Sequence, residues 1–396
     1  FELGDLTLTN ATGSDFTRIS GSQYSALMTP IDQGTITIAL AANKAVDAAG
    51  NGNQAANPVS TVFIDENFVR TRTQRIVNNF IARRADQITI NDPNLSNRLL
   101  NEGTKGRING NAELRNVRIA FNGTASGEDA NLAKLIGADK AAKVNLWTEA
   151  SIVSIHGKTA ENDLTLVYVG ADYRMNKDTL IGVIAQVDWA DEKDNIQNFA
   201  ISGTGWMVGP YVVTRIADKL IFDGRAALGR SNNDISPSQT YTDNFKTSRW
   251  LLKGQLTGDL TVNDWRVNPN IAVIYFKETQ KAYTDGLGIN IPEQTVKLGR
   301  VTFGPRFSKS FEQDNNMTLT PSLNVRGVWD FEQAQILNLA TGLANGTGKL
   351  RARTEVGLAA TFSNGTRVSL DGFYDGIGAS DFEAYGLKIG VGFPIQ

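Results

Sequence analysis

From Val144 to the C-terminus, apolar and polar side chains alternate with a period of two residues. Twelve segments of about 12 to 20 residues show this alternation, which is typical of strands whose two faces meet different surroundings. In the segment that begins near Asp243, Trp250, Leu252 and Leu256 fall on one face, whereas Arg249 and Lys253 fall on the other. The pattern predicts an all-β body of twelve antiparallel strands.

The connections between these segments alternate in length. The predicted strands begin near Val144, Asp163, Asp178, Gln197, Lys219, Asp243, Asp264, Pro292, Asn315, Thr347, Thr366 and Asp381. The short connections are Met175–Lys177, Ala217–Asp218, Val262–Asn263, Glu312–Asp314 and Ser363–Gly365. The long connections are Ala190–Ile196, Ser231–Thr242, Gln280–Ile291 and Glu332–Gly346.

Alternation alone fits either a soluble β-sandwich or a transmembrane β-barrel, in which the polar face lines the lumen. Three features favour the barrel: the even strand number, the alternation of short turns with long loops, and aromatic residues near strand ends, where membrane interfaces lie. The predicted aromatic girdle consists of Trp147, Trp189, Trp206, Tyr211, Trp265 and Trp329. The predicted lumen-facing residues include Asp188, Asp223, Arg225, Arg249, Arg300, Arg306, Arg326, Arg351, Arg353 and Glu355.

Residues 65–90 are predicted to form one long helix. Asp65 is a suitable N-cap, and Pro93 prevents easy continuation. Apolar residues recur at helical spacing at Val69, Ile76, Val77, Phe80, Ile81, Ala85 and Ile88. The rest of the surface carries Arg70, Arg72, Arg75, Arg83 and Arg84. Such a helix has about the length of a bilayer core, roughly 30 Å, but is too charged to face lipid.

The pattern divides the chain into four regions. Residues 1–64 form short alternating strands, and residues 65–100 contain the charged helix and a short second helix over 92–100. Residues 101–143 form a polar linker with one helix near Asp129–Ala142 and a strand that includes Leu114, Val117, Ile119 and Phe121. Residues 144–396 form the barrel.

Composition excludes several classes of function. The formal net charge of -2 gives no basic surplus for nucleic-acid binding. With no cysteine and one histidine, neither a disulfide framework nor a zinc site is expected. No glycine-rich stretch has the spacing of a phosphate-binding loop, and no apolar run is long enough for a transmembrane helix. We therefore expect no cofactor and no metal. No signal peptide opens the sequence, and its first residues, FELGDLTLTN, resemble the middle of a strand pair, so we expect the C-terminal piece of a longer protein.

The order of several segments resembles the β-domain of autotransporters, the translocators of type V secretion. The segments are VNLWTEASIVSIHG (144–157), VGADYRMNKDTLIGVIAQ (169–186), GWMVGPYVVTRIADKLIFDGRAALGRSNNDISP (205–237) and SRWLLKGQLTGDL (248–260). QRIVNNFIARRADQI, followed by NDPNLSNRL, resembles the pore helix of that family. One departure is at the C-terminus, where family members commonly end on an aromatic residue but this sequence places Phe393 before Gln396.

The segment VDAAGNGNQAANPVSTVFID resembles the end of a bacterial immunoglobulin-like repeat. Such a sandwich needs more strands than 63 residues supply, so we expect its opening strands upstream. The Asp and Asn residues of this turn either bind calcium or serve as ordinary turn residues.

The autotransporter resemblance implies a twelve-stranded outer-membrane barrel that is plugged by the charged helix and carries its passenger in cis to the cell surface. It also implies insertion into lipid with the help of the barrel-assembly machinery and periplasmic chaperones, and we expect a monomer. Because unpaired buried charge is costly, the helix arginines should pair with acidic residues of the lumen. The immunoglobulin-like fragment suggests an adhesin stalk.

Two motifs offer chemistry. Some autotransporters release the passenger by cyclisation of a helix asparagine, and Asn78 and Asn79 are candidates for this self-cleavage; the alternative is two polar helix residues. His156, with Ser154 nearby, could serve a barrel hydrolase or could be a rim histidine. Neither motif is specific, so no enzyme is expected. The alternatives to a translocator are a passive porin, an outer-membrane hydrolase and a soluble β-rich binding module.

Overall fold

The computed structural model describes residues 1–47, 49–100, 109–114, 117–122, 144–156, 160–313, 317–333, 335–339, 341, 350–363, 365–379 and 382–395. The chain divides into two compact units, Phe1–Thr71 and Arg72–Gln396. The helix predicted near Asp129–Ala142 lies outside the described residues. In the linker, the structure describes a hairpin of β6 (Asn109–Leu114) and β7 (Val117–Asn122) in place of the single predicted strand.

The first unit is built from two small sheets, as the alternating pattern predicted. A 3-10 turn (Leu3–Asp5) precedes β1 (Leu6–Thr9), which pairs with β4 (Gly34–Leu40), and β4 pairs with β5 (Val59–Phe63). The second sheet contains β2 (Ala11–Arg18) and β3 (Tyr24–Pro30). Stacked Phe16 and Tyr24 rings, 5.6 Å apart, join these two strands at one end.

The turn with calcium-like composition is held by its own side chains. The Asp47 carboxylate accepts hydrogen bonds from the backbone N–H groups of Ala49 and Asn51, both at 2.9 Å, and from the Asn51 side chain at 3.0 Å. The Asn51 amide is the main reason that the pKa of Asp47 lies below its ordinary value. These contacts support the interpretation as an ordinary turn.

Twelve long antiparallel strands form the barrel, which confirms the predicted fold class. They are β8 (Val144–His156), β9 (Ala160–Arg174), β10 (Thr179–Asp194), β11 (Phe199–Ala217), β12 (Leu220–Ser236), β13 (Asp243–Gly258), β15 (Trp265–Gln280), β18 (Gln294–Ser308), β20 (Met317–Glu332), β21 (Leu350–Thr361), β22 (Arg367–Ile377) and β23 (Glu383–Ile395). Short strands β14 (Leu260–Val262) and β19 (Phe311–Gln313) lie beside β15 and β20, and β16 (Tyr283–Thr284) and β17 (Asn290–Ile291) form a loop hairpin.

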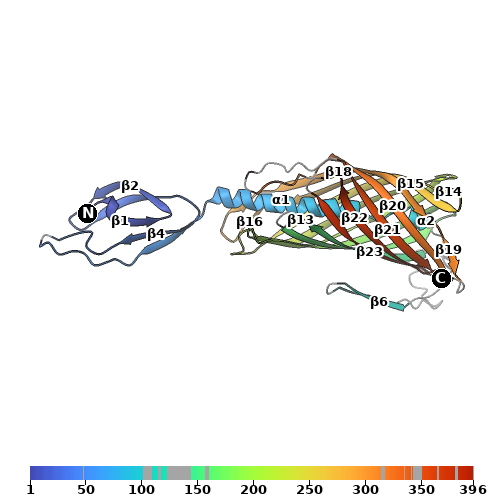
Figure 1. Cartoon of the computed structure of the whole chain (residues 1–396), viewed down its shortest axis with the longest axis horizontal. Coiled ribbons are helices and arrows are strands. Elements are labelled where there is room, and N and C mark those ends of the chain that lie inside the picture. The colour runs from blue at the N-terminus through green and yellow to red at the C-terminus, as the bar shows by residue number, and fades with distance from the viewer. Residues whose placement is uncertain are drawn as a thin grey trace. The chain divides into compact units, whose positions relative to one another are not determined.

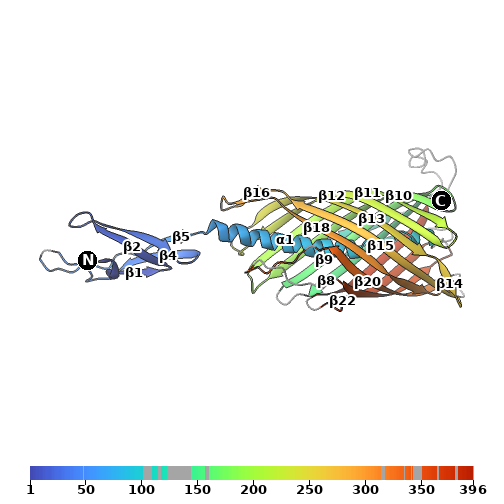
Figure 2. The same ribbon diagram turned by 90° about the horizontal axis from the view of Figure 1, so that it is seen from above.

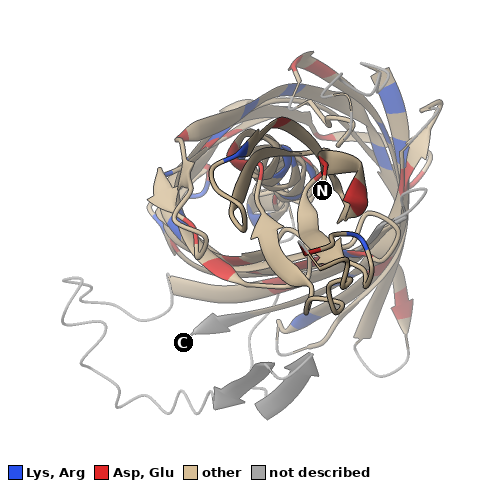
Figure 3. Ribbon diagram, turned by 90° about the vertical axis from the view of Figure 1, so that its left-hand side faces the viewer, with Lys and Arg blue, Asp and Glu red and all other residues tan. Residues whose placement is uncertain are grey.

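The sheet closes on itself because its first and last strands pair. Ile395 of β23 lies opposite Val144 of β8, and β13 pairs with β15 where Leu256 meets Ile271. Figure 1 and Figure 2 show these strands enclosing helix α1 (Glu66–Ile90). Figure 3 shows the ring of strands end-on, with basic and acidic segments in blue and red. A closed barrel leaves no free strand edge.

Burial follows the two-residue alternation along each strand. Leu228 and Val356 are 69% and 66% exposed on the outer surface, where lipid replaces water, whereas Arg225 and Arg353 are buried inside. Tight turns join strands at one end of the barrel, which we call the short-turn end, and longer connections lie at the other, the long-loop end. One long connection is shorter than predicted, since β12 extends through Ser236 and leaves only residues 237–242 as the loop.

The helix begins and ends where its sequence predicted. The Asp65 carboxylate accepts hydrogen bonds from the backbone N–H groups of Asn67 and Phe68, at 2.9 and 3.1 Å, and so caps the helix. The second helix is shorter than predicted: α2 spans only Asn97–Leu100. Pro93 lies in an extended connection before it because the Asp92 and Ser96 side chains bind the barrel wall.

The lumen is less uniformly polar than the sequence suggested. Every residue of the predicted apolar helix face is buried. Ile76, Phe80 and Ile81 belong to a core cluster that includes wall residues such as Phe199 and Phe276. The apolar face of the helix needs apolar partners, and inward-facing residues of the wall supply them.

Candidate functional site

The middle of α1 is held by a buried network of four charged residues. Arg84 Nη2 lies 2.5 Å from Glu278 Oε1, and Arg249 Nε lies 3.1 Å from the same oxygen. Arg249 also pairs with Asp188 at 2.6 Å. The Arg84 guanidinium stacks over the Phe80 ring at 4.6 Å. Two cations and two anions therefore balance at the centre of the lumen.

Two residues further along, on the opposite face of the helix, the charges are reversed. Asp86 is the acid on the helix, and it pairs with Arg300 and, at 2.8 Å, with Arg351 of the wall. Two wall acids complete this cluster, because Asp330 lies 2.6 Å from Arg300 and Asp375 lies 2.8 Å from Arg351. The helix therefore contributes charges of both signs, each matched to the wall.

A third cluster fixes the chain just beyond the helix. Asp92 pairs with Arg225 and, at 3.1 Å, with Lys253. Ser96 donates a hydrogen bond of 2.5 Å to Asp223. Nearby, Arg353 donates to the Asn91 side chain at 2.8 Å. Arg326 pairs with Glu355, and Glu355 also accepts from Arg353.

Among the described contacts, two helix arginines pair with lumen acids, as expected. Arg83 pairs with Glu192 and Arg84 with Glu278. At the start of the helix, Arg70 pairs with Glu66 of the same helix at 3.6 Å. Asp86 and Asp92 were not among the residues predicted to bind the wall. Their position in or beside an arginine-rich helix, together with predicted lumen arginines, could have indicated this role.

The long loops bind the first half of the lumen helix. Arg72 donates to the carbonyl oxygens of Gln197 and Pro237, the latter at 3.0 Å. Arg75 donates to the Leu339 carbonyl at 2.7 Å. The helix therefore runs from the long-loop end toward the short-turn end, where Asp92 and α2 lie.

The asparagine pair holds a loop segment. Asn79 Nδ2 donates to the Leu337 carbonyl, and its Oδ1 accepts from the Leu337 N–H, both at 2.7 Å. Asn78 donates to the Gln335 carbonyl at 2.8 Å. Ile336 and Leu339 pack against the helix core. We call residues 335–339 the strap.

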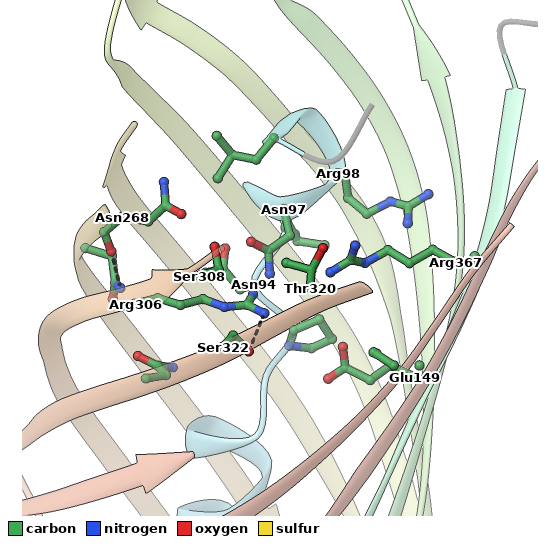
Figure 4. A pocket seen from close by; sticks show the side chains of 18 of the residues that line it. Asn94, Asn97, Arg98, Glu149, Asn268, Arg306, Ser308, Thr320, Ser322 and Arg367 are labelled. Atoms are coloured by element: carbon green, nitrogen blue, oxygen red, sulfur yellow. Dashed lines mark hydrogen bonds between the residues drawn. The ribbon is translucent and has the colours of Figure 1, made fainter. Parts of the chain in front are cut away.

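All ten residues that were predicted to face the lumen lie on the inner face of the barrel. Seven are buried, and the other three line a cavity: Arg306, Arg326 and Glu355. This cavity, of about 1360 Å³, lies at the short-turn end beside Asn94 and Asn97, as Figure 4 shows.

Two members of the predicted girdle instead point inward. Trp147 and Tyr211 are 5% and 3% exposed, and the Trp147 N–H donates to the Tyr211 hydroxyl at 3.0 Å. That hydroxyl donates to Asp172 at 2.9 Å. Both rings cover glycines of neighbouring strands, since a Cβ at Gly170 or Gly182 would lie 2.2 to 2.4 Å from them. The girdle prediction was wrong here because period-two patterning places an aromatic residue near a strand end without fixing its side.

The other four predicted girdle residues point outward. Trp206, Trp265 and Trp329 are 44–47% exposed, and Trp189 is half-buried between its neighbours on the outer surface. Trp250 and Tyr275 add a stacked pair with centroids 5.2 Å apart. The alternation had placed Tyr275, but not Trp250, among the aromatic residues near strand ends.

The described residues do not support a hydrolase site or a metal site. His156 is the last residue of β8, and the Ser154 hydroxyl donates to Asp163 at 2.7 Å. In the parts of the chain that the structure describes, no three His, Cys, Asp or Glu residues gather as metal ligands. No helix of the described residues is long and apolar enough to cross a membrane.

The closed barrel with a helix in its lumen agrees with the family to which the sequence is similar. The model of the autotransporter β-domain family matches residues 154–375, more than half of the chain. The chain belongs to the autotransporter family. A bacterial Ig-like domain model matches residues 1–63. Comparison with curated protein sequences gives no match.

One solved structure shows the same fold, and two others are similar to parts of the chain. The crystal structure of the β-domain of the Bordetella autotransporter Brka is 15% identical, with a TM-score of 0.52, and covers 64% of this chain and 99% of that one. The transport unit of the autotransporter AIDA-I from Escherichia coli is 11% identical over 68% of this chain and 98% of that one, with a TM-score of 0.49. The translocator domain of autotransporter NalP from Neisseria meningitidis is 15% identical over 67% and 94%, with a TM-score of 0.47.

This autotransporter is therefore an outer-membrane protein, and its β-barrel follows an Ig-like region that it carries in cis. The apolar outer face of the barrel meets lipid, and the charged clusters face the helix inside.

Proposed function

We propose that this autotransporter exports its own N-terminal region through the barrel and keeps it anchored at the cell surface. The direction of α1 carries this proposal. Arg72 and Arg75 contact the long loops, whereas Asp92 and Ser96 contact wall residues nearer the short-turn end. In outer-membrane barrels, long loops lie outside and short turns face the periplasm. The chain that precedes Arg72 then emerges on the outside.

The helix is the anchor in this proposal. Its three charge clusters and its apolar face bind the wall on several sides, so that a chain end outside stays tethered to the membrane. A passenger built from Ig-like units suits an adhesin stalk, which is an inference from fold alone. Insertion of the barrel would depend on the barrel-assembly machinery and periplasmic chaperones, and the protein would act as a monomer.

The anchored passenger is proposed to stay uncleaved. Self-cleavage at Asn78 or Asn79 requires the side-chain amide to attack its own main-chain carbonyl. In the structure both amides donate to strap carbonyls instead. Barrel hydrolysis is likewise not proposed, since the Ser154 hydroxyl donates to Asp163.

Single-cysteine labelling of intact cells tests the topology. The native chain has no cysteine, so Ser22→Cys, Thr240→Cys and Lys177→Cys each introduce one exposed thiol, in the Ig-like unit, a long loop and a short turn respectively. An impermeant maleimide should label positions 22 and 240 on intact cells and position 177 only after permeabilisation. Labelling of position 177 but not of position 240 would show that the barrel has the opposite orientation and would contradict the export proposal.

Retention is tested on the same cells. An immunoblot against the Ig-like unit should show one full-length band, unchanged in Asn78→Ala and Asn79→Ala variants. A smaller released fragment that disappears in either variant would show that the helix asparagine cleaves the chain.

A further inference from the structure

The cavity at the short-turn end differs in charge from the rest of the lumen. Ten basic and seven acidic side chains line it, together with eleven Ser and Thr residues. The first two clusters around the helix, by contrast, pair basic with acidic groups at close range, and the cavity shares only Asp92, Lys253, Arg326 and Glu355 with the third cluster. The cavity lies beside α2 and is walled largely by β15, β18, β20 and β22.

Two arginines in this cavity have only hydroxyl partners among the described residues. Arg306 Nη2 donates to Ser322 Oγ at 3.0 Å, and Arg367 Nη1 donates to Thr361 Oγ1 at 3.2 Å. No carboxylate of the described chain lies within ion-pair distance of either one. Figure 4 shows both side chains extending into the same space from opposite sides, with Thr320 and Asn94 between them. Two guanidinium groups that face a common space repel each other unless an anion lies between them.

The acidic side chains of the cavity do not neutralise the positive charge of Arg306 and Arg367. Glu355 already binds Arg326 and Lys388. Glu149 and Asp371 also line the space. Asp371 attracts both Arg306 and Arg367 from beyond ion-pair distance, and one carboxylate cannot neutralise two guanidinium groups. Arg98, on α2, lies on the same side of the cavity as Arg367, and its Nε is 3.1 Å from Asp172. The local surplus of donors therefore remains.

We infer that this cavity binds a small, soluble, phosphate-bearing molecule from the periplasmic side. Guanidinium groups bind phosphate oxygens through paired hydrogen bonds, and hydroxyl groups on neighbouring strands add neutral donors. A volume of about 1360 Å³ is large enough for a phosphate ester with its carrier group. The cavity lies inside the barrel, separated by the strands from lipid, which favours a water-soluble ester over a lipid headgroup. Binding in the cavity does not depend on passenger export, whereas the periplasmic side rests on the orientation given in the proposed function.

Calorimetric titration of the full chain in detergent tests the site. Pyrophosphate, as the probe, should bind saturably at constant ionic strength, with about one site per chain. The double variant Arg306→Gln, Arg367→Gln should bind at least about tenfold more weakly, since two charged partners are lost. Arg230→Gln, at an exposed arginine of β12 outside the cavity lining, is the matched control and should bind as the native chain does. Each variant is first checked for the heat-dependent gel shift of a folded barrel.

The outcomes separate the alternatives. Equal pyrophosphate affinity in the native chain and the double variant would overturn the inference, as would the absence of saturable binding. Glycerol phosphate should compete with pyrophosphate, whereas phosphatidylglycerol in mixed micelles should not. Competition by the micelles alone would assign the site to a lipid headgroup and overturn the soluble ligand. If the double variant does not fold, the single variants Arg306→Gln and Arg367→Gln are each expected to lower affinity severalfold.

Discussion

Arg84 of the helix and Glu278 of β15 form an ion pair at 2.5 Å, with side chains only 1% and 0% exposed. Glu278 also binds Arg249, so one carboxylate links the helix to two strands. Burial of charge is costly, so such a pair adds little net stability compared with an apolar contact. Its main effect is that removal of one partner leaves the other uncompensated.

Glu278→Gln should therefore destabilise the barrel strongly. The change leaves Arg84 and Arg249 to share Asp188 alone, and breaking a buried pair costs about 3–5 kcal/mol. Urea unfolding in lipid vesicles, followed by tryptophan fluorescence, measures the free energy of unfolding. Glu332→Gln is the control, because its pair with Lys297 is exposed and 4.0 Å long, and about 0–1 kcal/mol is expected. Equal losses in the two variants would contradict the role of burial.

Deletion of residues 65–90 should open the lumen to ions. The helix fills the lumen with its apolar face and its charge clusters, and the wall that remains is lined by charged and polar groups. Planar bilayer recordings should show severalfold higher single-channel conductance for the deletion than for the intact chain. Deletion of residues 1–64 retains the helix and should keep conductance low. An intact chain that already conducts like the 65–90 deletion would mean that the helix is no plug.

Asn79→Ala should release the strap. The side chain makes two hydrogen bonds with the part-buried Leu337 backbone, and losing them costs about 1–3 kcal/mol. Hydrogen exchange at the Leu337 amide should speed up by at least about tenfold, since 1.4 kcal/mol corresponds to that factor. Asn78→Ala removes only one bond, to Gln335, and should have a smaller effect. Unchanged exchange in Asn79→Ala would show that packing of Ile336 and Leu339 holds the strap alone.

Gly182→Ala should destabilise the barrel through a clash. A Cβ at this position would lie 2.4 Å from the Tyr211 ring and 2.6 Å from the Ala171 carbonyl oxygen. Overpacking of this kind costs about 1–3 kcal/mol. Gly254→Ala is the matched control, because its Cβ would meet only Phe222 at 3.8 Å, an ordinary contact, so a change within about 0.5 kcal/mol is expected. The urea titration used for Glu278 gives both values, and equal values would contradict the packing of Tyr211 over Gly182.

The parts of the fold that repeat with a fixed period could be predicted from the sequence. Twelve strands follow from alternation, because the inner and outer faces meet different solvents, and the helix follows from its apolar spacing and Asp65 cap. The inward turn of Trp147 and Tyr211 could not be predicted in the same way. Their direction depends on glycines in neighbouring strands, Gly170 and Gly182, and sequence alone does not align those strands.

Contacts that join distant segments were also beyond the sequence. The strap lies in a long connection with no periodic signal, and its partner Asn79 is 258 residues away. The roles of Asp86 and Asp92 could not be predicted, because their partners depend on how deep the helix lies in the barrel. A list of charged residues shows that pairs must form, but only the register of helix and wall decides which ones.

Arg84 and Asp86 carry opposite charges on opposite faces of α1, and each is matched to opposite charges on the wall. This arrangement has a consequence for where the helix comes to rest in the barrel. A shift of the helix by one turn, about 5.4 Å, would separate each charge from its buried counterpart, and a buried charge without a partner is costly. The clusters thus define a single stopping position for the helix along the barrel axis.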